Sequence, residues 1–223
     1  MTTFPNIQQE VGSATCGPNC LLNIYESLGI KTDLKQILKD LNITSKEYTY
    51  IPQLARHLND KKLSTIILSS NPNVVSPTWE NLGSLEIMEK LKKWLVYNKK
   101  DNWFFEILLL YFYLQEGGDI KILDLSTNII DDYLDKGYSL ISCLNESWIW
   151  QQRKIKDIVK YDDIKGKGMG HFVVVYGKEN DSYLISDPYP TKIKDRDGLY
   201  KINKQKLLVA TLVWNRSLVA VKK

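Results

Sequence analysis

The sequence contains few residues of the kinds that cross-link secreted proteins or span membranes. It has only three cysteines among 223 residues, too few for the disulfide framework of a small secreted domain. The N-terminus has neither the basic nor the apolar region of a signal peptide. The most apolar run, residues 103–114, includes Glu106 and is shorter than the roughly 20 residues of a membrane helix. We therefore expect a cytoplasmic protein with reduced thiols and no membrane partner.

The sequence also lacks a strong charge of either sign. Its 30 lysines and arginines against 26 aspartates and glutamates give a net charge of +4. The basic residues concentrate at 153–167 and 192–206, where aspartates are interspersed as in solvated loops. These clusters could favour an acidic substrate or partner. Without a continuous basic face, however, we expect no nucleic-acid partner.

The hydrophobic pattern changes from helical in the first half of the chain to strand-like in the second. Apolar residues at helical spacing predict helices at 16–28, 34–41, 52–61, 84–98, 103–116 and 126–137. Short β-branched and aromatic runs predict strands at 64–70, 121–125, 138–144, 171–177, 182–188, 207–214 and 217–223. Helices followed by mostly antiparallel strands indicate the α+β class.

Cys16 lies directly before Gly17-Pro18, at the start of the first predicted helix. Proline is favoured at the first helical position, so this pattern predicts Cys16 at a helix N-terminus. The positive end of the helix dipole and its free N–H groups favour a thiolate, the nucleophilic form of cysteine. Gly17 leaves room for a substrate backbone. Cys16 is therefore a candidate nucleophile, while an unreactive buried cysteine is the alternative interpretation.

His171 and Asp187 are candidates for the groups that activate this thiol. His171 follows a glycine-containing loop and opens a predicted strand, a rigid position suited to a general base. If that strand forms a hairpin with the next one, Asp187 lies beside His171, where a carboxylate can hold the imidazole tautomer. Cys16, His171 and Asp187 would then supply a nucleophile, a base and an orienting group. Taken alone, Asp187 before a proline is typical of a turn.

The other candidate residues have structural interpretations. Cys16 and Cys20 share a helix face and could bind zinc together with a histidine, but no spacing supplies a fourth ligand. Cys20 lies among leucines and Cys143 in an apolar strand, so we expect both in the core. His57, in the middle of a helix, is expected to be solvated or hydrogen-bonded. Several aromatic residues could wall a peptide groove or pack in the core: Trp148, Trp150, Phe172, Tyr176, Tyr189 and Trp214.

Three stretches of the sequence resemble the C39-like group of papain-like cysteine peptidases: QQEVGSATCGPNCLLNIYESLGI, GHFVVVYG and ISDPY. In that group, Cys-Gly-Pro or Cys-Gly-Ala opens a helix that ends at Leu-Gly. A Gly-His then opens a Val-rich strand, and an Asp-Pro follows on the next strand. YSLISCL also resembles the strand before the histidine. The resemblance covers about residues 8–30 and 137–190 and leaves a mainly helical segment at about 44–120 unmatched.

This resemblance implies a papain-like fold in a single domain over residues 1–223. An N-terminal helical part, with the nucleophile at a helix N-terminus, would pack on a mostly antiparallel sheet. Cys16 would be the nucleophile, His171 the general base and then acid, and Asp187 the residue that orients the imidazole. No metal or organic cofactor is required.

The resemblance also implies a glutamine upstream of the nucleophile that donates to the oxyanion. Such families usually place it about six residues before the cysteine, where this sequence has Glu10. A carboxylate there would repel an oxyanion, so we expect Gln9 to take the role in a shifted loop, with Gln8 as the alternative. Losing one oxyanion donor costs about 10²–10³ in rate, so this difference separates a good catalyst from a poor one.

The predicted function is hydrolysis of an amide or isopeptide bond in a peptide or protein substrate, through an acyl-thioester on Cys16. One alternative is a papain-like domain that binds a peptide or protein without cleaving it, as Glu10 and the unmatched segment suggest. Another is an acyltransferase or an amidase acting on a small molecule. C39 peptidases of peptide exporters also carry membrane and nucleotide-binding domains, which this sequence does not contain, so their leader-peptide substrate is not carried over.

Overall fold

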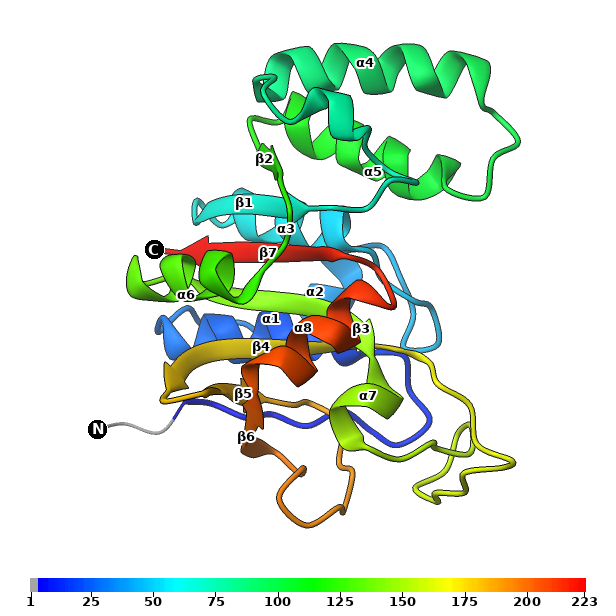
Figure 1. The fold of residues 1–223 in the computed structure, drawn as a ribbon, viewed down its shortest axis with the longest axis vertical. Coiled ribbons are helices and arrows are strands. Elements are labelled where there is room, and N and C mark those ends of the chain that lie inside the picture. The colour runs from blue at the N-terminus through cyan, green and yellow to red at the C-terminus, as the bar shows by residue number, and fades with distance from the viewer. Residues whose placement is uncertain (1–3) are drawn as a thin grey trace.

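The computed structural model describes residues 4–223, which form a seven-stranded sheet with helices on both faces (Figure 1). The strand order is β2-β1-β7-β3-β4-β5-β6. The strands are β1 Ser64–Ser69, β2 Asp119–Ile122, β3 Ser139–Asn145, β4 Gly170–Glu179, β5 Ser182–Ser186, β6 Leu199–Asn203 and β7 Ser217–Lys222. Strands β1 and β2 pair in parallel, and the other neighbouring pairs are antiparallel. The prediction of an α+β fold with a mostly antiparallel sheet is therefore confirmed.

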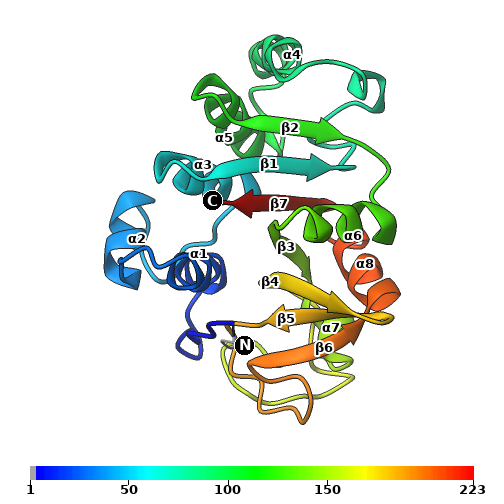
Figure 2. The same cartoon turned by 90° about the vertical axis from the view of Figure 1, so that its left-hand side faces the viewer.

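The helices divide between the two faces of the sheet, as Figure 2 shows. One face carries α1, α2 and α3, and the other carries α6, α7 and α8. Helices α4 and α5 pack on each other beside the β2 edge, at the top of Figure 1. The helices are α1 Cys16–Ser27, α2 Leu34–Asp40, α3 Ile51–Asp60, α4 Ser84–Tyr97, α5 Phe104–Gln115, α6 Thr127–Asp135, α7 Glu146–Trp150 and α8 Lys204–Leu212, with a 3-10 turn at Pro77–Trp79.

The core consists of two apolar clusters separated by the sheet. Strand β4 supplies both clusters, because successive strand residues point to opposite faces. Val174 packs with the cluster under α1 and α3, whereas Val173 and Val175 pack with the cluster under α6 and α8. This alternation fixes which side chains at the start of β4 face each layer. It therefore also fixes where His171 lies.

The prediction of a strand at residues 207–214 is wrong, because most of these residues lie in α8. Asn203 caps this helix by accepting hydrogen bonds from two backbone N–H groups of its first turn. Leu207, Ala210 and Thr211 are buried, at the spacing of one helix face. A short apolar run of β-branched residues is compatible with either structure, and here the cap and the tertiary packing favour the helix. Helix α7 and strand β6 were not predicted.

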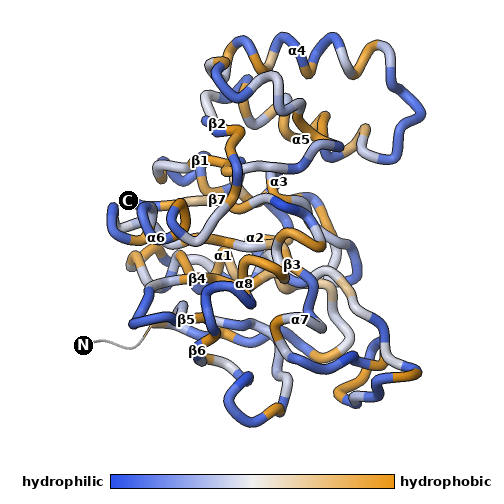
Figure 3. Tube along the Cα trace, in the orientation of Figure 1, coloured by the Kyte–Doolittle hydropathy of each residue, from blue (hydrophilic) through white to orange (hydrophobic). Residues whose placement is uncertain are grey.

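The segment at about 44–120 contributes to the same sheet. Its strand β1 lies between β2 and the C-terminal strand β7, and α3 packs against both β1 and β7. Figure 3 shows α4 alternating between hydrophobic and hydrophilic residues along its turns. This pattern fits a helix that buries Ile87 and Leu91 and exposes Leu85. Among residues 4–223, every helix is too short or too polar to cross a bilayer.

Candidate active site

Cys16 is the first residue of α1, and its side chain is half-buried. The preceding residue, Thr15, makes no side-chain capping bond to the helix, and the first turn contains no acidic residue. By contrast, side chains cap α2, α6, α7 and α8. The first N–H groups of α1 therefore remain available beside the thiol, together with the positive end of the helix dipole.

Gly17 has a different role from the one expected. A Cβ atom at this position would collide with the hydroxyl of Thr49 and crowd the side chain of Leu54. The space beside Gly17 is thus filled by the chain that enters α3, and is not open to a substrate backbone. Glycine at this position lets that chain pack closely against the start of α1.

His171 and Asp187 lie next to each other on the paired strands β4 and β5. Strand β4 begins at Gly170, and Asp187 directly follows the last residue of β5. The Nε2 atom of His171 lies 2.7 Å from Oδ1 of Asp187, and both side chains are buried. The hairpin predicted from the sequence therefore exists and brings the two side chains together. The remaining ring nitrogen, Nδ1, is the one left to interact with Cys16.

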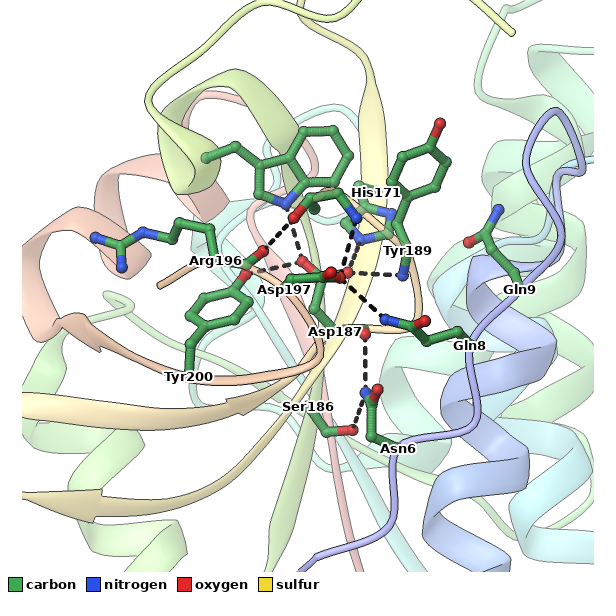
Figure 4. Close-up of polar contacts among 12 residues, drawn as sticks. Asn6, Gln8, Gln9, His171, Ser186, Asp187, Tyr189, Arg196, Asp197 and Tyr200 are labelled. Atoms are coloured by element: carbon green, nitrogen blue, oxygen red, sulfur yellow. Dashed lines mark hydrogen bonds and ion pairs between the residues drawn. The ribbon is translucent and has the colours of Figure 1, made fainter. Parts of the chain in front are cut away.

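The carboxylate group of Asp187 accepts four hydrogen bonds, some of which are drawn in Figure 4. Besides His171, the indole Nε1 of Trp150 (2.9 Å) and the hydroxyl of Tyr200 (2.8 Å) donate to Oδ2. The backbone N–H of Tyr189 donates to Oδ1 over 2.9 Å. An ionised carboxylate only accepts hydrogen bonds, so a site made of four donors matches it. This network also fixes the carboxylate against rotation.

The charge at Asp187 determines the protonation of His171. Burial alone would lower the pKa of His171, but the Asp187 carboxylate outweighs burial. The neighbouring Cys16 side chain acts in the same direction, and the net result raises the pKa of His171 to about 10. The indole of Trp150 covers the imidazole, with ring centroids 5.1 Å apart. This environment favours an imidazolium next to the thiol.

The two candidate glutamines point to different places, because they are neighbours on an extended segment (Figure 4). Gln8 is exposed and donates to Asp197 over 3.0 Å. Gln9 is buried and lines the same hollow as Cys16 and His171. Its backbone N–H donates to the carbonyl of Pro188 over 2.7 Å, which fixes this register. The structure thus places Gln9 in the hollow that Cys16 lines, whereas Gln8 bonds to Asp197 outside it.

Two hollows meet at Cys16. The polar hollow has a volume of about 550 Å³ and includes Gln9, Lys154 and His171 in its wall. The apolar hollow has a volume of about 500 Å³ and is walled mainly by aromatic and aliphatic groups such as Phe172. Both hollows share a narrow strip of residues: Ala14, Cys16, Tyr48, Met169 and Gly170. A peptide bound across Cys16 would therefore have polar surroundings on one side of the thiol and apolar surroundings on the other.

The remaining two cysteines and His57 are buried, and Cys143 also lines the apolar hollow. Cys20 and Cys143 are buried, and desolvation raises the pKa of both thiols well above the ordinary value. His57 is also buried, so the solvated alternative is wrong, and it hydrogen-bonds to the hydroxyl of Tyr25 over 2.6 Å. Within residues 4–223, no three His, Cys, Asp or Glu side chains form a group that could hold a metal ion.

Sequence reasoning missed three parts of the site. Tyr200 lies on the unpredicted strand β6, and Glu146 begins the unpredicted helix α7. Trp150 appeared only as one of several aromatic residues, without its hydrogen bond to Asp187. Asn145, which accepts from the backbone N–H of Ser147, is a capping signal that could have revealed α7. Nothing local in the sequence indicates the contact between Tyr200 and Asp187.

Comparison with known proteins supports the fold. The peptidase domain of Streptococcus ComA, a bi-functional ABC transporter involved in a quorum-sensing pathway, superimposes with a TM-score of 0.51. It is 14% identical, and the alignment covers 98% of each chain. A proposed C39-like peptidase from Bacillus anthracis gives a TM-score of 0.52 at 13% identity, over 99% of this chain and 95% of its own. No family model and no curated protein matches the sequence. The chain therefore has the papain-like fold of C39 peptidase domains.

Proposed function

We propose that the protein is a cysteine peptidase that hydrolyses an amide or isopeptide bond in a peptide or protein substrate. The observation that carries the proposal is the Asp187–His171 pair, whose imidazole lines the same hollow as the thiol of Cys16 at an uncapped helix N-terminus. The C39 peptidase fold supports it. We also propose that residues 1–223 act as one domain, because β1 and β2 extend the sheet that carries His171.

In the acylation step, the Cys16 thiolate attacks the carbonyl carbon of the substrate, and a carbon–sulfur bond forms. The electron pair of the carbonyl moves onto its oxygen to give a tetrahedral oxyanion. His171 holds the proton on Nδ1 while Asp187 holds Nε2–H. As the intermediate collapses, the carbon–nitrogen bond breaks and His171 gives its proton to the leaving amine. The products are an acyl-thioester on Cys16 and a free amine.

In the deacylation step, neutral His171 takes a proton from water, and the resulting hydroxide attacks the thioester carbonyl. The carbon–sulfur bond then breaks, and the acid product leaves. The sulfur departs as a thiolate, which restores the thiolate–imidazolium pair. An amine in place of water would make the same enzyme a transferase.

Two groups would stabilise the oxyanion. The free backbone N–H groups at the start of α1 adjoin the thiol. The Gln9 amide nitrogen donates to the carbonyl oxygen of Ser13 over 3.0 Å and to the hydroxyl oxygen of Ser13 over 3.3 Å. To donate to the oxyanion, the Gln9 amide would exchange its contact with the Ser13 hydroxyl for the substrate oxygen.

Alkylation of the native protein with iodoacetamide at pH 6 tests this proposal. A thiol with an ordinary pKa of about 8.5 is roughly 0.3% ionised at that pH. A thiolate–imidazolium pair would therefore react about 10²-fold faster. We expect rapid modification of Cys16, located by peptide mass spectrometry, and a loss of that rate in His171→Ala.

The buried thiols serve as internal controls, because Cys20 and Cys143 lie in the core. If Cys16 reacts no faster than these thiols, or if His171→Ala leaves its rate unchanged, the protein is not a thiol hydrolase of this kind. If Cys16 reacts as expected, a peptide library analysed by mass spectrometry should then yield defined cleavage sites. Those sites should disappear in Cys16→Ala.

A further inference from the structure

The wall of the polar hollow includes Lys154, whose ammonium group has no ion pair in the described part of the chain. Lys154 as a whole residue is only 8% exposed, although lysine is usually an exposed residue. Within residues 4–223, no carboxylate lies within 4.0 Å of its Nζ atom. The Nζ atom lies 4.6 Å from the centre of the Tyr189 ring instead. Backbone bridges to Tyr161 and Lys167 hold the residue in place.

Other polar groups in the same hollow are also unsatisfied. The hydroxyl of Tyr189 and the Oε1 atom of Glu146 are buried and have no hydrogen-bond partner in the described part of the chain. Burial raises the pKa of Glu146 to about 7, so its carboxyl group is only partly ionised near neutral pH. The exposed rim carries Lys46, Lys156 and Asp157. The positive charge of the hollow thus exceeds its negative charge, so the hollow favours an anionic ligand.

The position of His171 indicates which part of a substrate the polar hollow receives. His171 lines the polar hollow and not the apolar hollow. In the proposed mechanism, His171 gives its proton to the leaving amine, so the leaving fragment lies on the His171 side of Cys16. The polar hollow is therefore on the side of the leaving fragment, and the acyl fragment lies toward the apolar hollow.

We propose that the polar hollow binds a carboxylate of the leaving fragment, with Lys154 and the Tyr189 hydroxyl as its donors. This inference rests on the proposed peptidase function and adds the substrate class to it. The carboxylate supplies the anion that Lys154 lacks and accepts the unused hydrogen of the Tyr189 hydroxyl. It can be the C-terminal carboxylate of a peptide or an acidic side chain close to the scissile bond.

Alkylation by a pair of matched probes tests the charge preference. N-iodoacetylglycine carries a carboxylate, and its glycinamide counterpart is neutral and nearly the same size. In both cases the Cys16 sulfur forms a bond to the methylene carbon and iodide leaves. We expect the rate ratio of acid to amide at Cys16 to fall about tenfold in Lys154→Gln, the size of one charge-assisted hydrogen bond. Tyr189→Phe keeps the ring under Lys154 and should lower the ratio by a smaller factor.

Lys160→Gln is the matched control, because Lys160 lies on the same loop, is exposed and does not line the hollow. Its acid-to-amide ratio should equal that of the wild type. An unchanged ratio in Lys154→Gln, with the amide probe still reacting normally, overturns the carboxylate site but leaves the proposed peptidase intact. A Cys16 that reacts with neither probe contradicts the peptidase instead. The two failures are therefore distinguishable.

Binding to Cys16→Ala distinguishes the two sources of carboxylate and requires no catalysis. The ligands are Ala-Ala-Ala with a free C-terminus, its C-terminal amide, and Ala-Asp-Ala amide, compared by calorimetry. Tighter binding of the free acid identifies a C-terminal carboxylate, and tighter binding of the aspartyl amide identifies an acidic side chain. In either case Lys154→Gln should remove the difference. If the neutral amide binds as well as both acids, the proposal is wrong.

Discussion

The two histidines are equally buried, yet their pKa values are shifted in opposite directions. His57 lies in α3 and His171 at the start of β4, and their exposed fractions are 4% and 3%. Each ring is hydrogen-bonded, His57 to a tyrosine hydroxyl and His171 to a carboxylate. Burial lowers the pKa of His57, whereas the pKa of His171 is raised to about 10. Burial alone therefore does not determine how an imidazole titrates.

The difference lies in the carboxylate that each ring meets. Asp40 is partly exposed, lies 3.4 Å from Nε2 of His57, and also faces the ammonium of Lys61. Asp187 is buried, lies 2.7 Å from His171, and has only neutral donors as its other partners. A buried carboxylate without a competing cation acts at full strength on the imidazole. A shared surface carboxylate does not overcome the desolvation of His57.

The largest expected effect is that of Asp187→Asn, which removes the buried carboxylate that distinguishes His171 from His57. The asparagine amide group would face Trp150 or Tyr200, both of which are donors, and would leave unmatched polar groups in the core. Without the negative charge, the pKa of His171 falls below its ordinary value, as for His57. We expect the iodoacetamide rate of Cys16 at pH 6 to fall about 10²-fold, to the level of an ordinary thiol.

Asp197→Asn is a suitable control for this variant. Asp197 lies near the site and accepts from Gln8 and from the backbone N–H of Thr191, but it does not touch His171. It should leave the rate at Cys16 unchanged. If Asp187→Asn folds and alkylates Cys16 as fast as the wild type does, Asp187 does not control the imidazole.

The second prediction is that the contributions of His171 and His57 to folding stability change in opposite directions as the pH changes. The folded-state pKa of His171 is above its unfolded value of about 6.5, so its stabilisation is complete below pH 6.5 and is lost as pH rises toward 10. The folded-state pKa of His57 is lowered, so its contribution is complete above pH 6.5 and is lost as pH falls through the lowered value. NMR of the ring protons at pH 7.5 should show His171 protonated and His57 neutral.

The same contrast should appear in stability measurements. The free energy of unfolding of the wild type minus that of His171→Gln should decrease from pH 6.5 to pH 9. The corresponding difference for His57→Gln should decrease as pH falls from 6.5 to 5. Two histidines that titrate together near pH 6.5 would show that the carboxylates do not distinguish them.

Sequence patterns predicted the meeting of His171 and Asp187 because that meeting depends on local rules. A hairpin brings the start of one strand beside the end of the next, and a cysteine before Gly-Pro lies at a helix start. The choice between Gln8 and Gln9 is different. Neighbours on an extended segment point to opposite sides, so the inward residue depends on the hydrogen bond to Pro188 from a distant part of the chain.

Other features of the molecule depend on tertiary packing and could not be predicted from the local sequence. Residues 207–214 have the composition of a strand, but Asn203 and the core under α8 make them a helix. Lys154 appeared within a solvated basic cluster, yet its side chain is buried over Tyr189. A single sequence identifies which residues carry charge. It does not identify which of them the fold packs against other side chains.

The smallest expected effect comes from a matched pair of substitutions, Tyr25→Phe and Tyr200→Phe. Tyr25→Phe removes the buried hydroxyl that hydrogen-bonds to His57. Tyr200→Phe removes the buried hydroxyl that donates to Asp187. Each should lower the free energy of unfolding by roughly 1 kcal/mol. Only Tyr200→Phe should slow alkylation of Cys16, by about two- to tenfold, because one donor to the Asp187 carboxylate is lost. Equal effects on Cys16 would mean that both hydroxyls act through general stability. A slower reaction in Tyr200→Phe alone, with unfolding energies equal in the two variants, would instead assign the difference to the carboxylate that faces His171.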